Sequence, residues 1–206
     1  LGSHRVMACD STNAEDVARL MDGVKADMVL TDIPYNISQQ SNGLRKLDYG
    51  EWDKQSGMES TWIPILEQLT NKTAIIFCGN RQLSYILQYF EDNSFSVRSL
   101  VWHKPNPNVI NCDKLYIEST EFAAYAKKSG GVFNPKYKHN LFEFSIENKR
   151  QHPTQKPVVL LCDLVSDCSE PDNIILDLFL GSGSTLIAAH KLGRILYGCE
   201  ISEAYV

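Results

Sequence analysis

The 206-residue sequence has few of the features that mark a secreted, metal-binding or membrane protein. None of its six cysteines stands in a C-x-x-C pair, and most lie in apolar stretches. We therefore expect buried thiols rather than a zinc site or a disulfide framework. No apolar run is long enough to span a bilayer, and no basic segment followed by an apolar stretch opens the chain. These absences predict a cytoplasmic protein without a bound metal.

The sequence also lacks an excess of basic residues. Lysine and arginine total 20 against 25 acidic residues, a net charge of −5. This balance argues against a general nucleic-acid binder, but a local basic groove stays possible because potential depends on how charge is distributed. With no internal repeat, low-complexity tract or linker, residues 1–206 are expected to form one domain with a substantial core.

Apolar periodicity predicts strands that alternate with helices for most of the chain. The order favours an α/β fold with a doubly wound, mostly parallel sheet covered on both faces. Thr12 and Glu15 fit a capping box at the first helix. The polar stretches 36–57 and 127–151 are expected to be loops that face a substrate. The expected strands are 6–8, 28–31, 73–78, 95–102, 122–126, 174–179 and 195–199, and the expected helices follow Thr12 and cover 59–69, 81–90, 158–165 and 186–192.

A glycine-rich segment, 177–185, follows an apolar strand and opens a helix. Its glycines allow close approach of a ligand to the backbone. It is not a P-loop, because no lysine follows Gly183, and it lacks the third glycine of the dinucleotide fingerprint, since that position is Leu186. Glu200 lies at the end of the next strand, where an acid would hold ribose hydroxyls. The pattern favours a nucleoside cofactor over an ordinary tight turn.

The segment Asp32-Ile33-Pro34-Tyr35 follows a second apolar strand. A carboxylate at the carboxyl end of a buried strand lies where open α/β sheets bind ligands. The carboxylate can accept the hydrogens of an exocyclic amine while an aromatic ring stacks on its base. Taken alone, the segment fits an ordinary capped loop better than a binding site.

Together these segments resemble the DNA amino-methyltransferases that use S-adenosylmethionine. In that family an Asp-Pro-Pro-Tyr motif binds the target base, and here Asp32–Tyr35 departs from it only at Ile33. Phe179–Gly183 matches the family's Phe-x-Gly-x-Gly cofactor motif. His152–Pro157 is similar to its His-Pro-Thr-x-Lys-Pro segment, which packs around the methionine end of the cofactor. The resemblance covers nearly the whole chain.

The order of the motifs resembles the β-class, a circular permutation of the usual Rossmann-like methyltransferase fold. The resemblance implies a seven-stranded sheet with one antiparallel strand, expected at 122–126. Catalytic roles fall on Asp32, Pro34 and Tyr35. S-adenosylmethionine would be bound by Asp10, Ser11, Asp32, Thr154, Lys156, Asp177, Phe179, Gly181, Gly183, Ser184, Thr185 and Glu200.

The target atom follows from what each methylation chemistry needs. No cysteine follows a proline, so the covalent route to cytosine C5 is not expected. Family members with aspartate at the first motif position usually modify adenine N6, so Asp32 favours adenine by base flipping and direct in-line transfer. Cytosine N4 is the main alternative. RNA or protein glutamine methylation usually goes with asparagine there, and a silent subunit would be expected to lose Asp32, the glycines or Glu200.

DNA is the expected partner, and its phosphates require positive charge. The resemblance further implies a bacterial or phage restriction-modification setting, association with the nucleoid and a homodimer. No separate recognition domain is visible in the chain. The candidate phosphate contacts are Arg45, Lys46, Lys104, Lys136, Lys138 and Arg150.

Overall fold

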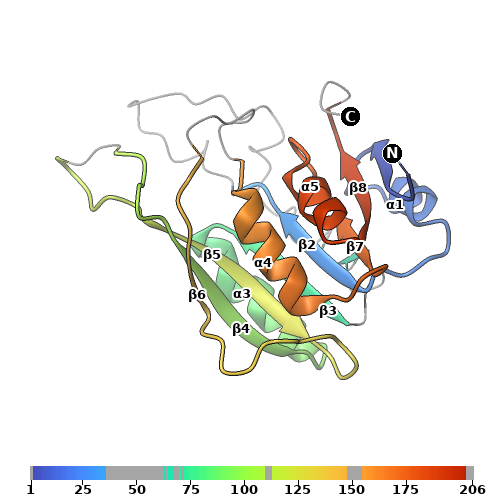
Figure 1. Cartoon of the computed structure of the whole chain (residues 1–206), viewed down its shortest axis with the longest axis horizontal. Helices are drawn as coiled ribbons and strands as arrows, with labels where there is room; N and C mark the ends of the chain where they lie inside the picture. The colour runs from blue at the N-terminus through green and yellow to red at the C-terminus, as the bar shows by residue number, and fades with distance from the viewer. Residues whose placement is uncertain are drawn as a thin grey trace.

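The computed structural model describes residues 2–35, 63, 65–66, 70, 72–109, 113–147 and 155–202. Within these ranges an eight-stranded sheet has the order β1-β8-β7-β2-β3-β5-β4-β6 (Figure 1). The strands are β1 (Arg5–Ala8), β2 (Met28–Asp32), β3 (Thr73–Cys78), β4 (Ser96–His103), β5 (Thr120–Lys127), β6 (Leu141–Glu143), β7 (Ile174–Asp177) and β8 (Ile195–Glu200). The helices are α1 (Ala14–Met21), α3 (Asn80–Asp92), α4 (Val158–Cys168) and α5 (Ser184–Lys191).

Helices cover both faces of the sheet, which confirms the predicted α/β class. Figure 1 shows α4 and α5 on one side of the sheet and α3 on the other. Alternate residues of β2 enter different cores: Met28 and Leu30 pack in the cluster that contains α4 and α5 residues, and Val29 packs in the cluster that contains α1 and α3 residues. Burial on both faces explains why the central parallel strands are almost continuously apolar.

The first helix begins one residue later than its capping pattern suggests. Asn13 is the N-cap, and its side chain accepts hydrogen bonds from the backbone N–H groups of Glu15 and Asp16. Thr12 is not the cap; its backbone N–H and hydroxyl donate to Asp10 Oδ1 at 2.8 and 2.7 Å. Asparagine and threonine both satisfy orphan helix donors, so the sequence alone did not separate them.

The prediction of seven strands is wrong, because β6 adds an eighth. It pairs in parallel with β4 and buries only Phe142, while its two other residues are exposed. Trp102 Nε1 donates to the carbonyl oxygen of Phe144 at 2.7 Å, which ties this edge to β4. A three-residue strand with one buried side chain has no periodicity to detect. The predicted antiparallel strand is confirmed as β5, which runs against both β3 and β4.

Two other predictions fall partly outside the described residues. In the helix expected at 59–69, Ile63, Ile65 and Leu66 are helical, and Ile63 and Leu66 are fully buried. The loop expected at 36–57 lies outside the description, as do residues 148–151 of the second loop. In the described part of the chain no helix has the length and apolarity to cross a membrane.

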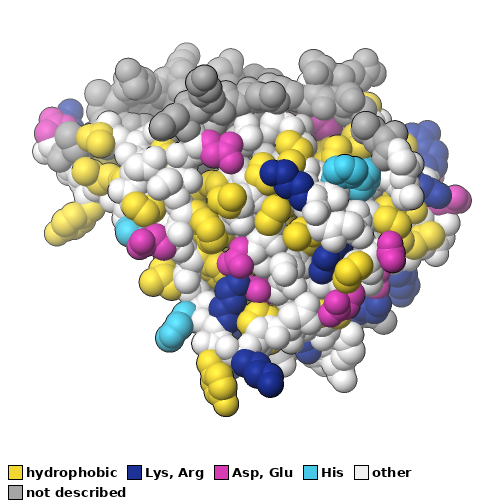
Figure 2. All heavy atoms as spheres, in the orientation of Figure 1, with side chains coloured by type: hydrophobic (Ala, Val, Ile, Leu, Met, Phe, Trp, Pro, Cys, Tyr) yellow, Lys and Arg dark blue, Asp and Glu magenta, His cyan; other side chains and the backbone are white. Residues whose placement is uncertain are grey.

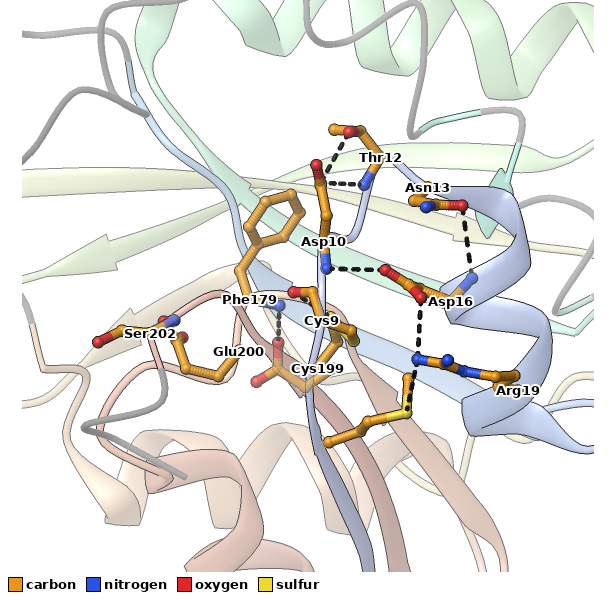
Figure 3. Close-up of a disulfide and its surroundings, with 12 residues drawn as sticks. Cys9, Asp10, Thr12, Asn13, Asp16, Arg19, Phe179, Cys199, Glu200 and Ser202 are labelled. Atoms are coloured by element: carbon orange, nitrogen blue, oxygen red, sulfur yellow. Dashed lines mark hydrogen bonds and ion pairs between the residues drawn. A yellow bond between two sulfur atoms is a disulfide. The ribbon is translucent and has the colours of Figure 1, made fainter.

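Two cysteines far apart in sequence form a disulfide, so the expectation of unpaired thiols is wrong for Cys9 and Cys199. Their Cα atoms are 5.8 Å apart although 190 positions separate them (Figure 3). The pairing arises because β1 and β8 are parallel neighbours, a relation that cysteine spacing does not reveal. Cys78, Cys162 and Cys168 are free thiols, as predicted.

The sheet has a switch point between β2 and β7. These two strands are parallel neighbours, and the chain continues from β2 to β3 on one side and from β7 to β8 on the other. Ligands of open α/β sheets bind beyond the carboxyl ends of the strands at such a point. Asp32 ends β2 and Asp177 ends β7, so the fold brings the two predicted motifs to adjacent positions.

Candidate active site

Asp32 ends β2, and its two carboxylate oxygens have different surroundings. Its Oδ2 lies 2.5 Å from the ammonium nitrogen of Lys156, whereas its buried Oδ1 has no hydrogen-bond partner among the described residues. Burial raises the pKa of Asp32, against the opposing charge of Lys156. A buried acceptor without a donor is unfavourable in the free protein, and an amine hydrogen placed there would satisfy it.

Lys156 joins Asp32 to a carboxylate that the sequence reasoning missed. The ammonium of this nearly buried side chain, 6% exposed, lies 3.1 Å from Glu121 Oε2 and donates to the Tyr35 hydroxyl at 3.1 Å. Burial alone would lower the pKa of Lys156, but Asp32 and Glu121 raise it. The resemblance assigned this lysine to the cofactor, and the structure places its charge against the target-base motif.

Glu121 lies on β5 and completes this group. Its Oε1 accepts from Lys104 at 3.0 Å, and its Oε2 accepts from the Tyr35 hydroxyl at 3.2 Å. Burial acts to raise the pKa of Glu121, yet Lys156 and Lys104 outweigh it and hold the pKa at about 2. An acid at the start of an otherwise apolar strand, 120–126, was the signal available in the sequence. We call Asp32, Tyr35, Lys104, Glu121 and Lys156 the charged cluster.

The turn after Asp32 is fixed by backbone contacts. Gln82 Nε2 donates to the carbonyl oxygen of Pro34 at 2.9 Å, and Gln82 Oε1 accepts from the Gly79 N–H at 2.9 Å. Ile33 is 2% exposed, and its N–H donates to the carbonyl of Phe77 at 3.2 Å. A proline could not donate this bond, so the departure of Ile33 from the family motif has a structural role here.

Asp177 anchors the second half of the site with neutral donors. This 2% exposed carboxylate accepts from Thr31 Oγ1 at 2.7 Å and from the Phe179 N–H at 3.1 Å through the same oxygen. Burial raises the pKa of Asp177 to about 6, partly offset by hydrogen bonds from Thr31 and Thr185. The carboxylate thereby fixes the start of the glycine-rich turn to β2.

The glycine-rich turn fits a nucleoside cofactor. Gly181 and Gly183 have φ values of 53° and 80°, and nothing lies within 4 Å of the position a Cβ would take at Gly183. Gly183 caps α5 without a side-chain hydrogen bond, which leaves helix N–H groups for a ligand. Glu200 Oε2 accepts from the Gly181 N–H at 2.7 Å and Oε1 from Ser202 N–H at 2.9 Å, and each oxygen keeps capacity for a hydroxyl.

The residues directly after β1 lie beside Glu200 and form a third part of the site. The Cys9 N–H donates to the Glu200 carbonyl at 3.0 Å, so Asp10 follows directly beside the predicted ribose carboxylate. Figure 3 shows Asp10 and Glu200 on the two segments joined by the disulfide. Ser11 is 7% exposed. The structure therefore brings together the predicted cofactor residues of three separate segments.

Several predicted site residues are not brought to this edge. Lys138 Nζ pairs with Asp163 at 2.8 Å and Asp167 at 2.7 Å, near the end of α4. Lys156 precedes that 11-residue helix, so Asp163 and Asp167 lie roughly 10 and 16 Å away from it along the helix axis. Lys136 is exposed in the same segment. Thr154, Arg45, Lys46 and Arg150 lie outside the described residues.

Charge on the described surface is mixed. Figure 2 shows acidic and basic side chains interspersed on the face it presents rather than gathered into one basic patch. Lys104, a predicted phosphate contact, forms an ion pair with Glu121, and its side chain is 13% exposed. No group of three or more metal-ligating side chains occurs among the described residues. The site thus offers a buried amine acceptor, an aromatic ring and a cofactor turn.

Comparisons with known proteins agree with this chemistry. The family profile described as DNA methylase, of the N6/N4 methyltransferases, matches residues 26–206. A type II methyltransferase of Moraxella bovis, M2.MboI, is 28% identical over 84% of this chain and 75% of its own length. M.ScaI of Streptomyces caespitosus is 40% identical over 87% of this chain and 72% of its length. The crystal structure of an M1.HpyAVI–SAM complex superposes with a TM-score of 0.77 at 30% identity, covering 98% of this chain and 95% of the other.

Proposed function

This chain belongs to the DNA methylase family and is an S-adenosylmethionine-dependent DNA methyltransferase, and from that premise we propose that it methylates N6 of adenine. The observation that carries the proposal is the buried Oδ1 of Asp32, which has no hydrogen-bond partner among the described residues and lies in the same short segment as Tyr35. An exocyclic amine supplies the hydrogen that this oxygen lacks. The aspartate at the first motif position favours adenine within the family.

Asp32 and Pro34 act on the target amine. When the base is flipped into the site, its amine donates to Asp32 Oδ1 and orients its lone pair toward the cofactor turn. The Pro34 carbonyl, already held by Gln82, lies on the same turn as a second acceptor. S-adenosylmethionine supplies an electrophilic methyl group. Transfer would form the N–C bond as the sulfonium S–C bond breaks, with S-adenosylhomocysteine as the leaving group, and the methylated amine would then release its extra proton to solvent.

Tyr35 stacks on the flipped base. Its hydroxyl is held by Lys156 and Glu121, so the ring orientation is set before the base arrives. Alignment of this kind can supply roughly 7–11 kcal/mol of a barrier, so no strong general base is needed. Flipping costs a few kcal/mol, which the stacking and amine contacts offset.

The cofactor residues keep their proposed roles from the family resemblance. Asp10, Ser11 and Glu200 would hold the nucleoside. Asp177, Phe179, Gly181, Gly183, Ser184 and Thr185 would form the turn, and Thr154 and Lys156 would lie near the methionine end. The open space at Gly183 and the free acceptor capacity of Glu200 support this assignment. The ammonium of Lys156 bonds Asp32, so this residue also contacts the target-base motif.

The proposal is tested with labelled S-adenosylmethionine and mixed-sequence DNA, followed by nucleoside analysis. We expect N6-methyladenine from the wild type and a loss of roughly 100-fold or more in Asp32→Asn. In this variant the Lys156 ammonium donates to the amide oxygen, so the amide NH₂ faces the substrate amine. Two donors then face each other, and the amine has no acceptor. Asp172→Asn, in an exposed turn before β7, is the matched control. N4-methylcytosine as the product, or full activity in Asp32→Asn, contradicts the proposal.

We also propose that the protein acts in a bacterial cytoplasm, associated with the nucleoid, as a homodimer. The compartment is supported by bacterial relatives such as M2.MboI. The dimer rests on the family resemblance alone. Sedimentation of the purified protein at micromolar concentration tests it, and a monomeric mass contradicts it.

A further inference from the structure

We propose that Glu121 is a positioning residue for methyl transfer, which holds Lys156 and Tyr35 so that Oδ1 of Asp32 stays available to the target amine. This inference rests on the proposed role of Asp32 as amine acceptor. Glu121 lies on β5 and was not part of any motif in the sequence. It reaches the site because β5 is inserted antiparallel between β3 and β4.

The contacts show what Glu121 holds. Lys156 Nζ is 2.5 Å from Asp32 Oδ2 and 3.1 Å from Glu121 Oε2, so one ammonium is shared by two carboxylates. Tyr35 lies between the same groups, because its hydroxyl accepts from Lys156 and donates to Glu121. Lys104 fills the remaining side of Glu121 at 3.0 Å. Asp32 and Tyr35 face the substrate. Tyr35 therefore contacts Glu121 directly, and Asp32 is linked to Glu121 through Lys156.

The charges of the cluster balance only with Glu121 present. Two lysines face two carboxylates in a region where Lys156 and Lys104 are 6% and 13% exposed. Without the Glu121 charge, Lys156 would bind Asp32 alone and draw electron density from the acceptor of the amine. The Tyr35 hydroxyl would lose its acceptor at the same time. Both changes reach the substrate through Asp32 and Tyr35, so Glu121 acts by positioning them.

Glu121 is not a proton acceptor for the reaction. Lys156 and Lys104 overcome the effect of burial and hold its pKa at about 2, so it remains a carboxylate and a weak base at any working pH. The carboxylate that titrates with the reaction is Asp32, which faces Lys156 before α4, Glu121 on β5, Cys78 on β3, Asp177 on β7 and its own neighbour Tyr35.

The test is the pH profile of kcat in Glu121→Gln at saturating S-adenosylmethionine. Glutamine keeps the size and one acceptor but removes the charge. We expect kcat to fall roughly 10- to 100-fold, as for a small misplacement of reacting groups, with KM for the cofactor within about twofold. The negative charge of Glu121 is one of the causes that raise the Asp32 pKa, so the acid limb of the kcat profile should move to lower pH.

Controls separate positioning from a structural effect. Glu170→Gln, in an exposed turn, should leave kcat and its profile unchanged. Glu121→Asp retains the charge, so its acid limb should stay within a few tenths of a pH unit of the wild type; this variant also covers the case in which Glu121→Gln fails to fold. An unchanged kcat in Glu121→Gln, or a loss of kcat without movement of the acid limb, overturns the inference.

The inference fails separately from the proposed function. If Asp32→Asn is fully active, Asp32 is not the acceptor of the target amine, and the proposed function is contradicted. If Asp32→Asn is inactive while Glu121→Gln behaves as the wild type, only the role of Glu121 falls. Measuring the methylated nucleoside in each variant assigns the result to one or the other.

Discussion

The two halves of the site meet at the same sheet edge and are built on opposite principles. The charged cluster joins side chains separated by up to 124 positions, with Lys156 bonded to Asp32 and Tyr35 to Glu121. The glycine-rich turn relies mainly on nearer residues, since Asp177 holds Phe179 and Glu200 holds Gly181, at separations of 2 and 19, and Thr31 adds one distant contact to Asp177. One half depends on balanced charges and the other on backbone N–H groups.

This difference matches what each half is proposed to bind. A neutral amine needs one acceptor of set direction, and a lysine shared by two carboxylates fixes that direction without occupying both oxygens. A nucleoside with hydroxyls needs close approach to the backbone, which glycine permits. We therefore expect substitutions in the cluster to affect activity and stability together, and substitutions in the turn to separate them.

Removing the central cation should have the largest effect. Lys156→Met removes a nearly buried ammonium and leaves two partly buried carboxylates, 29% and 23% exposed, without their shared partner. Breaking a fully buried pair typically costs about 3–5 kcal/mol, and the exposure of these carboxylates places this change at the lower end. We expect a loss of that size in the free energy of unfolding, measured in urea, together with loss of methyl transfer.

Lys138→Met is the matched control for the shared-lysine argument. Lys138 also pairs with two carboxylates, Asp163 and Asp167, but it is 28% exposed and lies near the far end of α4. Its removal should cost about 1 kcal/mol or less and leave methyl transfer intact. Equal losses of stability in both variants would show that burial does not distinguish the two lysines.

Asp177→Asn should stabilise the folded protein, whereas removal of Lys156 or Lys138 destabilises it. Burial raises its pKa from 3.8 to about 6, so the folded protein binds a proton there that the unfolded chain has released. The stability from this group is greatest below about pH 4 and is lost as the pH rises to 6. Above that the ionised group costs up to about 3 kcal/mol. Asp177→Asn should therefore raise the unfolding free energy at pH 7.5 by about 1 to 3 kcal/mol, the lower value applying where the lost charge-assisted hydrogen bonds offset most of the gain.

Denaturant titrations of Asp177→Asn at pH 4.5, 6 and 7.5 check this sign. The gain should shrink toward the acid end, and Asp172→Asn, whose carboxylate is exposed, should show no such trend. A variant less stable than the wild type at pH 7.5 would mean that the three neutral donors stabilise the ionised carboxylate more than burial penalises it.

The smallest effect is expected at the turn itself. Gly183 has φ of 80° and Gly193 has φ of 70°, and neither has an atom within 4 Å of the position that an added Cβ would take. Alanine at either site should cost about 1–2 kcal/mol of stability from backbone strain alone. Only Gly183→Ala should also weaken S-adenosylmethionine binding, by about tenfold in calorimetry. Equal cofactor affinity in the two variants would show that the turn at Gly183 does not contact the cofactor.

The sequence predicted the helix–strand order and the turn half of the site, because both depend on local patterns. Runs such as 28–30 and 174–176 are apolar on both faces, and the glycines that follow the second run mark the turn. It missed β6, which buries only Phe142, and the disulfide, which joins strands that are neighbours only in the folded sheet. It also missed Glu121, since one acid in an apolar strand is no motif.

Contiguous motifs were enough to predict a methyltransferase with an Asp-x-Pro-Tyr loop and a cofactor turn, because the residues of each motif are close together whatever the rest of the chain does. Which charges meet Asp32 depends instead on how distant segments fold together. β5 enters the sheet antiparallel beside β3, and the segment before α4 returns to the same edge. The free energy of a buried carboxylate depends on those distant partners, and no local pattern specifies them.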